Sequence, residues 1–372
     1  MIRAGFGIFY DTSAGQVGSL AGLFPNNAFG FPPPVTLPIG NLTPLLPVIS
    51  TQPPYPSGVY GFVNDVSLPR SYQWNVALEK SFGGKQVVSA TYVGQAGRSL
   101  LRQEASFQPN SNFTGFISLT GNDARSNYDA LQLQYRHPLS ARVQALLNYT
   151  WSHSLDNVSD DGLQTASHTV ISGARDYANS NFDVRQSFSG AITLLVPSAA
   201  KSGFVSVLTR GWSLDTVIVA RSGFPFNATA LGGGPGGIGL RRPDLVAGQA
   251  IWLDKAAAPG GKSLNPLAFT YPTFGQQGAE PRNDIPGFGL TQVDLSIARK
   301  FPLSERVSLQ FRTDAFNVLN HPNFANPIAL IFPFGGIELS STQMLNQALG
   351  GLNPLFQEGG PRSLQLSLRL TF

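Results

Sequence analysis

The chain has no cysteine, few charged residues and no long apolar run. Without cysteine it has no disulfide scaffold, thiolate metal site or cysteine nucleophile. Charged residues make up 12%, about half of the ~25% typical of soluble domains, which argues against a soluble helical enzyme. No stretch approaches the ~20 apolar residues of a membrane helix. No basic segment followed by a long apolar run comes after Met1, so no signal peptide is predicted.

What the chain does have is 42% hydrophobic residues, 40 glycines, 28 prolines and 26 phenylalanines. The net charge is +4, but basic residues are scattered and adjacent only at Arg241-Arg242 and Arg299-Lys300. A nucleic-acid partner is therefore not expected, because such proteins cluster their basic residues. Mean hydropathy is close to zero. With no apolar helix, the membrane architecture left open is the β-barrel, whose strands alternate apolar and polar residues.

Apolar and polar residues alternate in ten segments. The clearest lies at the C-terminus, where Leu364, Leu366 and Leu368 share one face of an extended strand, with polar residues between them. A helix would scatter these leucines around its circumference. The pattern predicts ten strands, at about residues 2–10, 72–82, 88–92, 131–135, 143–151, 188–196, 212–220, 293–297, 307–316 and 363–372.

The connections between these segments alternate short and long. Short ones are expected at 83–85, 137–142, 197–211 and 301–306, and long ones at 11–71, 95–127, 152–185, 223–291 and 319–362. Outer-membrane barrels have short periplasmic turns and longer extracellular loops, whereas nothing enforces this alternation in a soluble sandwich. The sequence therefore predicts an all-β fold, an antiparallel transmembrane β-barrel segment of about ten strands.

Two groups of side chains are assigned by their place on these strands. Aromatic residues near strand ends would form girdles at the membrane interfaces, although aromatics are also simply favoured in strands. They are Tyr72, Tyr149, Trp151, Trp212 and Phe372. Charged residues on the polar faces would point into the barrel lumen and pair with each other or with a plug. They are Glu79, Arg136, Asp294, Arg312, Asp314 and Arg369.

No motif indicates catalysis, a cofactor or a metal. Gly260-Gly261-Lys262-Ser263 ends like a phosphate-binding loop, but Ala256 replaces the required first glycine, so a polar loop is expected. The aspartates of residues 156–161 lack a closing glutamate and favour a solvated turn over a calcium loop. The four histidines lie far apart. We expect no catalytic, cofactor-binding or metal-ligating residues and no enzyme activity.

Several segments are similar, in order, to TonB-dependent receptors of the Oar-like type. Residues 311–324, FRTDAFNVLNHPNF, resemble the penultimate strand and following loop of that family. Weaker matches are LPRSYQWN at 68–75, SNYDAL at 126–131, NYTWS at 148–152, FDVRQ at 182–186, GW at 211–212 and SGFPF at 222–226. These receptors carry an N-terminal carboxypeptidase-regulatory-like domain, a plug and a barrel.

The resemblance implies a receptor in the cell outer membrane that binds an unidentified ligand through extracellular loops and imports it with inner-membrane energy. It implies four partners: outer-membrane lipid, the ligand, a TonB-type energy-transducing protein that acts through the plug region, and the barrel-assembly machinery, which would read the terminal strand ending at Phe372.

Because the family's barrels have more strands, residues 1–372 are interpreted as the C-terminal part of such a receptor, without its plug and N-terminal domains. The alternatives are a self-contained small outer-membrane barrel, a surface adhesion protein or a soluble β-sandwich binding module, none of them a transporter.

Overall fold

The structure is a computed structural model. It describes residues 1–12, 52–55, 58–83, 86–107, 110–140, 142–159, 176–199, 202–231, 240–273, 278–327, 329–332, 337–339 and 360–372. Large parts of the expected long connections 11–71, 152–185 and 319–362 lie outside these ranges.

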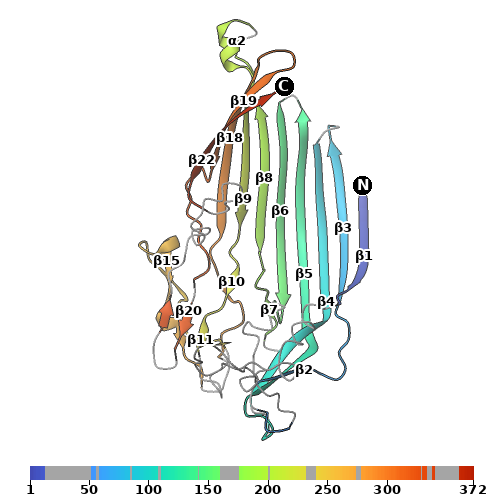
Figure 1. The fold of residues 1–372 in the computed structure, drawn as a ribbon, viewed down its shortest axis with the longest axis vertical. Coiled ribbons are helices and arrows are strands. Elements are labelled where there is room, and N and C mark those ends of the chain that lie inside the picture. Colours follow the sequence, from blue (N-terminus) through green and yellow to red (C-terminus); the bar gives the residue numbers. More distant parts are fainter. Residues whose placement is uncertain are drawn as a thin grey trace, which may run out of the picture.

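A single large sheet dominates the fold (Figure 1). Ten long strands follow one another in chain order, and every neighbouring pair is antiparallel, as the alternation predicts. They are β1 (Ile2–Tyr10), β3 (Arg70–Phe82), β4 (Gln86–Phe107), β5 (Phe116–Ser140), β6 (Val143–Asp156), β8 (Gln186–Leu195), β9 (Trp212–Arg221), β18 (Leu290–Pro302), β19 (Ser308–Phe316) and β22 (Ser363–Thr371). The short strands β2 (Val59–Phe62) and β7 (Ala178–Asn179) pair with β5 and β6.

Strand register gathers the apolar residues on one face. Directly opposite residues of an antiparallel pair point to the same side of the sheet. Val76 lies opposite Tyr92, Tyr92 opposite Leu131, and Leu131 opposite Trp151. All four side chains are exposed, and Trp151 reaches 55%. A continuous exposed apolar face of this kind is stable against lipid and is an aggregation hazard in water. We call it the outward face.

The connections alternate between the two ends of the sheet as predicted, but their lengths follow the prediction only in part. The turns between β3 and β4, β5 and β6, β8 and β9, and β18 and β19 all lie at the upper end of the sheet in Figure 1. The other connections lie at the opposite end, and the one between β4 and β5 is shorter than the one between β8 and β9. The connection between β8 and β9 contains a short helix, α2 (Phe204–Thr209), which the strand pattern did not predict.

One expected loop was wrong. Residues 95–127 are mostly strand, because β4 continues to Phe107 and β5 begins at Phe116. The register shifts between Gly97 and Leu100 and again before Arg102, and these irregularities break the period-two pattern. The two strands therefore extend as a ribbon past the region that the alternation identifies.

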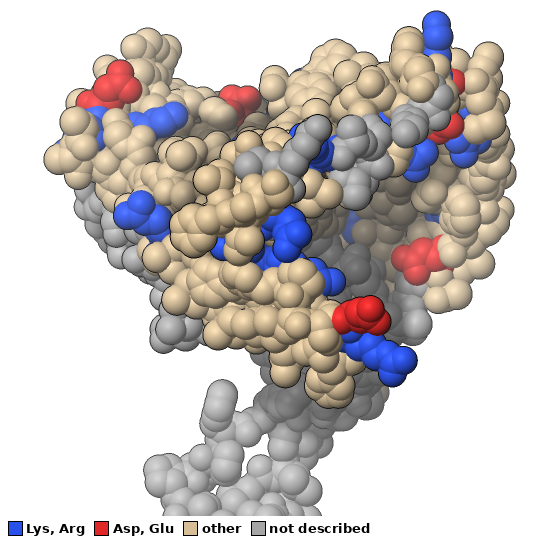
Figure 2. All heavy atoms as spheres, turned by 90° about the horizontal axis from the view of Figure 1, so that it is seen from above, with Lys and Arg blue, Asp and Glu red and all other residues tan. Residues whose placement is uncertain are grey.

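The sheet curves around a hollow interior (Figure 2). Its outermost strands are β1 and β22. In the part of the chain that the structure describes, β1 pairs only with β3 and β22 only with β19.

The long connection between β9 and β18 contains small strands and 3₁₀ turns. These are β10 (Pro225–Phe226), β11 (Thr229–Leu231), β12 (Leu240–Arg241), β13 (Asp244–Leu245), β14 (Trp252–Asp254), η4 (Pro259–Gly261), β15 (Lys262–Leu264), η5 (Pro266–Ala268), β16 (Phe269–Thr270) and β17 (Ile285–Pro286). β11 also pairs with β20 (Ala329–Ile331) of the next connection, which continues to β21 (Ile337–Leu339). We call these elements, with β2, β7 and the ends of β4 and β5, the loop layer.

Candidate functional site: the loop layer and the sheet interior

The loop layer has its own hydrophobic core. Side chains from β10, β11, β15, β17 and β20 pack together, and Ile285 and Ala230 are fully buried. The full cluster is Phe226, Ala228, Ala230, Leu264, Ala268, Phe269, Ile285, Ala329 and Ile331. The long connections at this end therefore form a packed structure that can present fixed side chains to a ligand.

Buried ion pairs join this core to the long strands. The carboxylate of Asp176 accepts hydrogen bonds from Arg102 of β4 at 2.8 Å and from Arg242, next to β12, at 2.9 Å. The Arg102 side chain is only 1% exposed. Buried charges persist in proteins only when they are paired, so Asp176 fixes the two arginines and the segments that carry them.

A second ion pair lies at the end of β6. Arg282 donates to Asp156 Oδ1 at 2.7 Å and also to the backbone carbonyls of Asp156 and Asp176. The hydroxyl of Ser159 donates to the same Asp156 carboxylate. Asp156 is therefore paired with an arginine, and the residues that the structure describes hold no cluster of three His, Asp or Glu side chains that could bind a metal ion. The aspartate-rich turn at residues 156–161 was compared above with a calcium loop. Residues 160–161 of this turn lie outside the residues that the structure describes.

Glu280 is a buried carboxyl group in this layer. Its Oε1 accepts the Ala228 backbone N–H at 3.1 Å, and its backbone carbonyl accepts Nε–H of Arg242 at 2.9 Å. Burial raises the pKa of the Glu280 carboxyl to about 7, and Asp284 adds to the rise. The Ala228 hydrogen bond and Arg242 act in the opposite direction and reduce it. Glu280 thus changes charge near neutral pH inside a packed loop layer.

The inward face of the sheet is polar and hydrogen-bonded. Arg312 of β19 donates to Asp314 at 2.8 Å and lies 3.5 Å from Asp215 of β9. Asp215 also accepts a hydrogen bond from Thr193 of β8 at 2.7 Å, and Ser296 of β18 bonds to Asp314. A network across four strands therefore lines this side of the hollow.

The other charged residues assigned to the lumen are spread along the strands. Asp294 accepts from the Gln292 amide and from the Asn317 backbone N–H. Glu79 forms an ion pair with Arg3 at 2.9 Å. Arg136 lies opposite Leu146 and Val87, and Arg369 lies opposite Gln310, in both cases exposed. Thus Arg312 and Asp314 come together, while the remaining four stay separate.

The aromatic residues assigned to the girdles lie on the outward face. Tyr72 lies near the loop-layer end of β3, whereas Tyr149 and Trp151 lie near the middle of β6, because β6 continues to Asp156. Trp212 starts β9 beside α2 and donates its indole N–H to the Leu208 carbonyl at 2.9 Å. Phe372 follows β22 and is 93% exposed. Their role as a membrane girdle stays a prediction.

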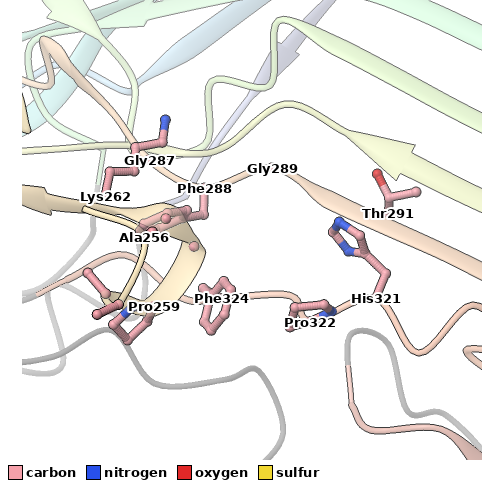
Figure 3. A pocket seen from close by; sticks show the side chains of 14 residues that line it. Ala256, Pro259, Lys262, Gly287, Phe288, Gly289, Thr291, His321, Pro322 and Phe324 are labelled. Atoms are coloured by element: carbon pink, nitrogen blue, oxygen red, sulfur yellow. The ribbon is translucent and has the colours of Figure 1, made fainter. Parts of the chain in front are cut away.

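The structure also forms a groove that the sequence did not predict. Its volume is about 850 Å³, and it lies between the turn 256–262, residues 287–291 and residues 321–324 (Figure 3). In the sequence, Lys262 belongs to an incomplete phosphate-binding loop and is expected in a polar loop. It begins β15, after a turn in which Gly260 and Gly261 have φ values of 68° and 75°. The Gly-Gly-Lys motif is visible in the sequence, but the residues that form the groove with Lys262 come from distant segments of the chain.

An exposed apolar outward face, an inward ion-pair network and packed loops at one end define an outer-membrane β-barrel protein. The chain belongs to the family described as "Outer membrane beta barrel domain", whose model matches residues 1–352. The protein is therefore located in the cell outer membrane. The structure has no helix long and apolar enough to span a membrane among the residues it describes.

One similar solved structure is the outer membrane transporter YddB from Escherichia coli. The identity is 10% and the TM-score is 0.46; the match covers 83% of this chain and 33% of that chain. The chain thus spans about a third of that transporter's length. No curated protein matches the sequence.

Proposed function

We propose that the protein is the barrel part of a TonB-dependent receptor of the Oar-like type. Such a receptor binds a ligand through its extracellular loops and imports it using energy from a TonB-type protein. The ordered loop layer is the observation that carries the proposal. Asp176 and the Arg282–Asp156 pair tie the β4–β5 ribbon and the β6–β8 and β9–β18 connections into one packed body at the long-loop end. A barrel that served only as a membrane anchor would not need these buried charges.

The inward network supports a pathway for a polar solute. Arg312, Asp314 and Asp215 offer charges of both signs along the hollow interior. In a complete receptor these groups would contact a plug, through which the TonB-type protein acts. We expect no chemistry from this chain, because binding and transport need only recognition groups.

The edges of the sheet support the interpretation as part of a larger barrel. β1 and β22 are each paired on one side in the described residues. An unpaired strand edge in lipid costs several kcal/mol for each unsatisfied backbone group, by order of magnitude. We propose that further strands of the full receptor lie between them.

A cross-linking experiment separates this proposal from the self-contained barrel. Residues 1–372 contain no cysteine, so the paired variant Phe6→Cys with Leu368→Cys introduces the two thiols into this part of the receptor, and any cysteine elsewhere in the receptor is replaced by serine. In a closed ten-strand barrel, β1 and β22 would be neighbours and a short bifunctional reagent would join them. We expect no intramolecular cross-link in the full-length protein, and efficient cross-linking would contradict the larger barrel.

Transport itself is tested by nutrient depletion. The parent strain, a strain lacking this gene and a strain lacking the TonB-type protein are grown in the same complex medium, and the solutes that remain are measured by mass spectrometry. We expect at least one class of solute that only the parent removes. If the three strains deplete the medium equally while the gene deletion abolishes cell attachment, the protein is an adhesin and the transport proposal fails.

A further inference from the structure

The groove beside Lys262 faces the lipid side of the sheet. Thr291 of β18 lines it and lies opposite Ala220. Ala220 lies opposite Phe188, and Phe188 opposite Tyr149, so Thr291 shares the outward apolar face. Its neighbour Gln292 is buried on the inward side, where it bonds to Asp294. At Thr291 the groove is therefore on the side of the sheet away from the interior.

The groove lies at the level of the outer membrane boundary. At the short-turn end of β18, Arg299 lies over the rings of Trp212 and Phe301, at 5.3 and 4.4 Å. Aromatic and arginine side chains in this arrangement are typical of a membrane interface. A transmembrane strand crosses the hydrocarbon layer in roughly 9–11 residues. Counting from Phe301 along β18 by that length reaches Thr291, so the groove meets the opposite leaflet, the one on the long-loop side.

The lining of the groove has the chemistry of a site for an anion attached to a sugar or lipid. Figure 3 shows Lys262 toward one end, His321 and Thr291 toward the other, and the rings of Phe288 and Phe324 between them. The Lys262 ammonium lies 5.5 Å from the centre of the Trp252 ring and 5.7 Å from that of Phe288. No Asp or Glu lines the groove among the described residues, and Lys262 has no salt bridge there, although Asp254 is its register partner.

The wall that carries Lys262 is held in place before any ligand binds. The Phe288 ring is 5.5 Å from Trp252 and 5.7 Å from Phe324, centre to centre. Gly260 packs so closely on Phe288 that a Cβ there would lie 2.2 Å from the ring. A preorganised cation next to aromatic rings lowers the cost of binding, because little side-chain freedom is lost.

We propose that this groove binds the phosphorylated sugar headgroup of a lipid in the outer leaflet. Lys262 takes the phosphate through a charge-assisted hydrogen bond. Phe288 and Phe324 contact the sugar and the start of the acyl chains, and His321 and Thr291 offer hydrogen-bonding groups to the rest of the headgroup. The site is distinct from the proposed transport pathway, because Thr291 lies on the face of the sheet away from that pathway. Besides the groove itself, the proposal requires only that the protein lies in the outer membrane, and it does not depend on the proposed transport function.

The test uses full-length protein in detergent and, as probes, a purified diphosphorylated glycolipid, the same lipid without its phosphates, and a soluble sugar phosphate. Bound lipid is counted by native mass spectrometry. In the variant Lys262→Gln we expect phosphorylated lipid to bind roughly ten- to a hundredfold more weakly, the usual effect of losing a hydrogen bond to a charged group. The matched control is Lys255→Gln, an exposed lysine of the same turn that does not line the groove.

Three results would overturn the proposal. They are equal binding of the lipid with and without phosphates, equal weakening by both lysine variants, and binding of the soluble sugar phosphate as tightly as the lipid. The last result would identify a solute site. Unchanged far-ultraviolet circular dichroism in both lysine variants shows that a loss of lipid binding is not caused by misfolding. The variant Phe288→Leu leaves Lys262 in place and should also weaken lipid binding, so it tests the aromatic part of the groove.

Discussion

Removing the charge of Asp176 should open the loop layer. In the variant Asp176→Asn, the partners Arg102 and Arg242 remain buried, at 1% and 10% side-chain exposure, without their shared carboxylate. Breaking a buried ion pair by removing one partner costs about 3–5 kcal/mol. At 1.4 kcal/mol per factor of ten, the open population of the layer should rise by roughly 100- to 4,000-fold. The long sheet, paired along its whole length, should stay folded.

Hydrogen exchange measured by mass spectrometry checks this prediction. We expect faster exchange in peptides covering 100–107, 116–120 and 240–245, and unchanged exchange in the strands β8 and β9. The control variant is Glu305→Gln, which changes an exposed carboxylate at the short-turn end. If exchange in the loop-layer peptides matches that of the control, the ion pairs do not hold the layer and the reasoning is refuted.

Further predictions concern pH, the outward face and assembly. Burial raises the pKa of Glu280 to about 7, so the folded layer keeps a proton that the unfolded chain releases above its usual value of 4.5. Loop-layer stability should therefore fall as pH rises from about 4.5 to 7, and in Glu280→Gln the protease resistance of the layer should lose this dependence. The variant Leu133→Arg places a charge on the lipid side and should lower stability to urea by about 2–4 kcal/mol, whereas Gln132→Arg, on the opposite face, should change it little. If the barrel-assembly machinery reads Phe372, then Phe372→Ala should reduce surface levels far more than Leu364→Ala does, and equal levels would leave Phe372 as an interface residue only.

The period-two pattern predicted the sheet because each residue's face is set locally. In segments such as 363–372, apolar side chains must face lipid and polar ones the interior, so the sequence alone indicates strand, face and neighbour. The same rule fails where both faces meet protein. Residues 98–107 and 116–125 belong to the loop layer, and there Arg102 and Thr120 are buried. Their apolar and polar residues do not alternate, so the period-two pattern predicts a loop where the structure has strands.

The loop layer could not be predicted because its contacts join distant segments. Asp176 meets Arg102 across 74 positions, and Arg282 meets Asp156 across 126. Neither pair has a characteristic spacing. Lys262 is visible in the sequence as a basic residue after two glycines, but Phe288 comes from the far end of the same connection and His321 and Phe324 come from the next one. Among the charged residues assigned to the interior, Arg312 and Asp314 were close enough in one strand for their pairing to be anticipated.

The central claim is that one face of the sheet lies against lipid in the outer membrane. Because the chain has no cysteine, single variants at successive positions of one strand, Leu131→Cys, Gln132→Cys, Leu133→Cys and Gln134→Cys, can each carry one fluorescent label. In vesicles, we predict that brominated lipid quenches the labels at 131 and 133, while a water-soluble quencher reaches those at 132 and 134. Equal quenching at all four positions, or quenching by the soluble reagent at 131 and 133, would contradict the account.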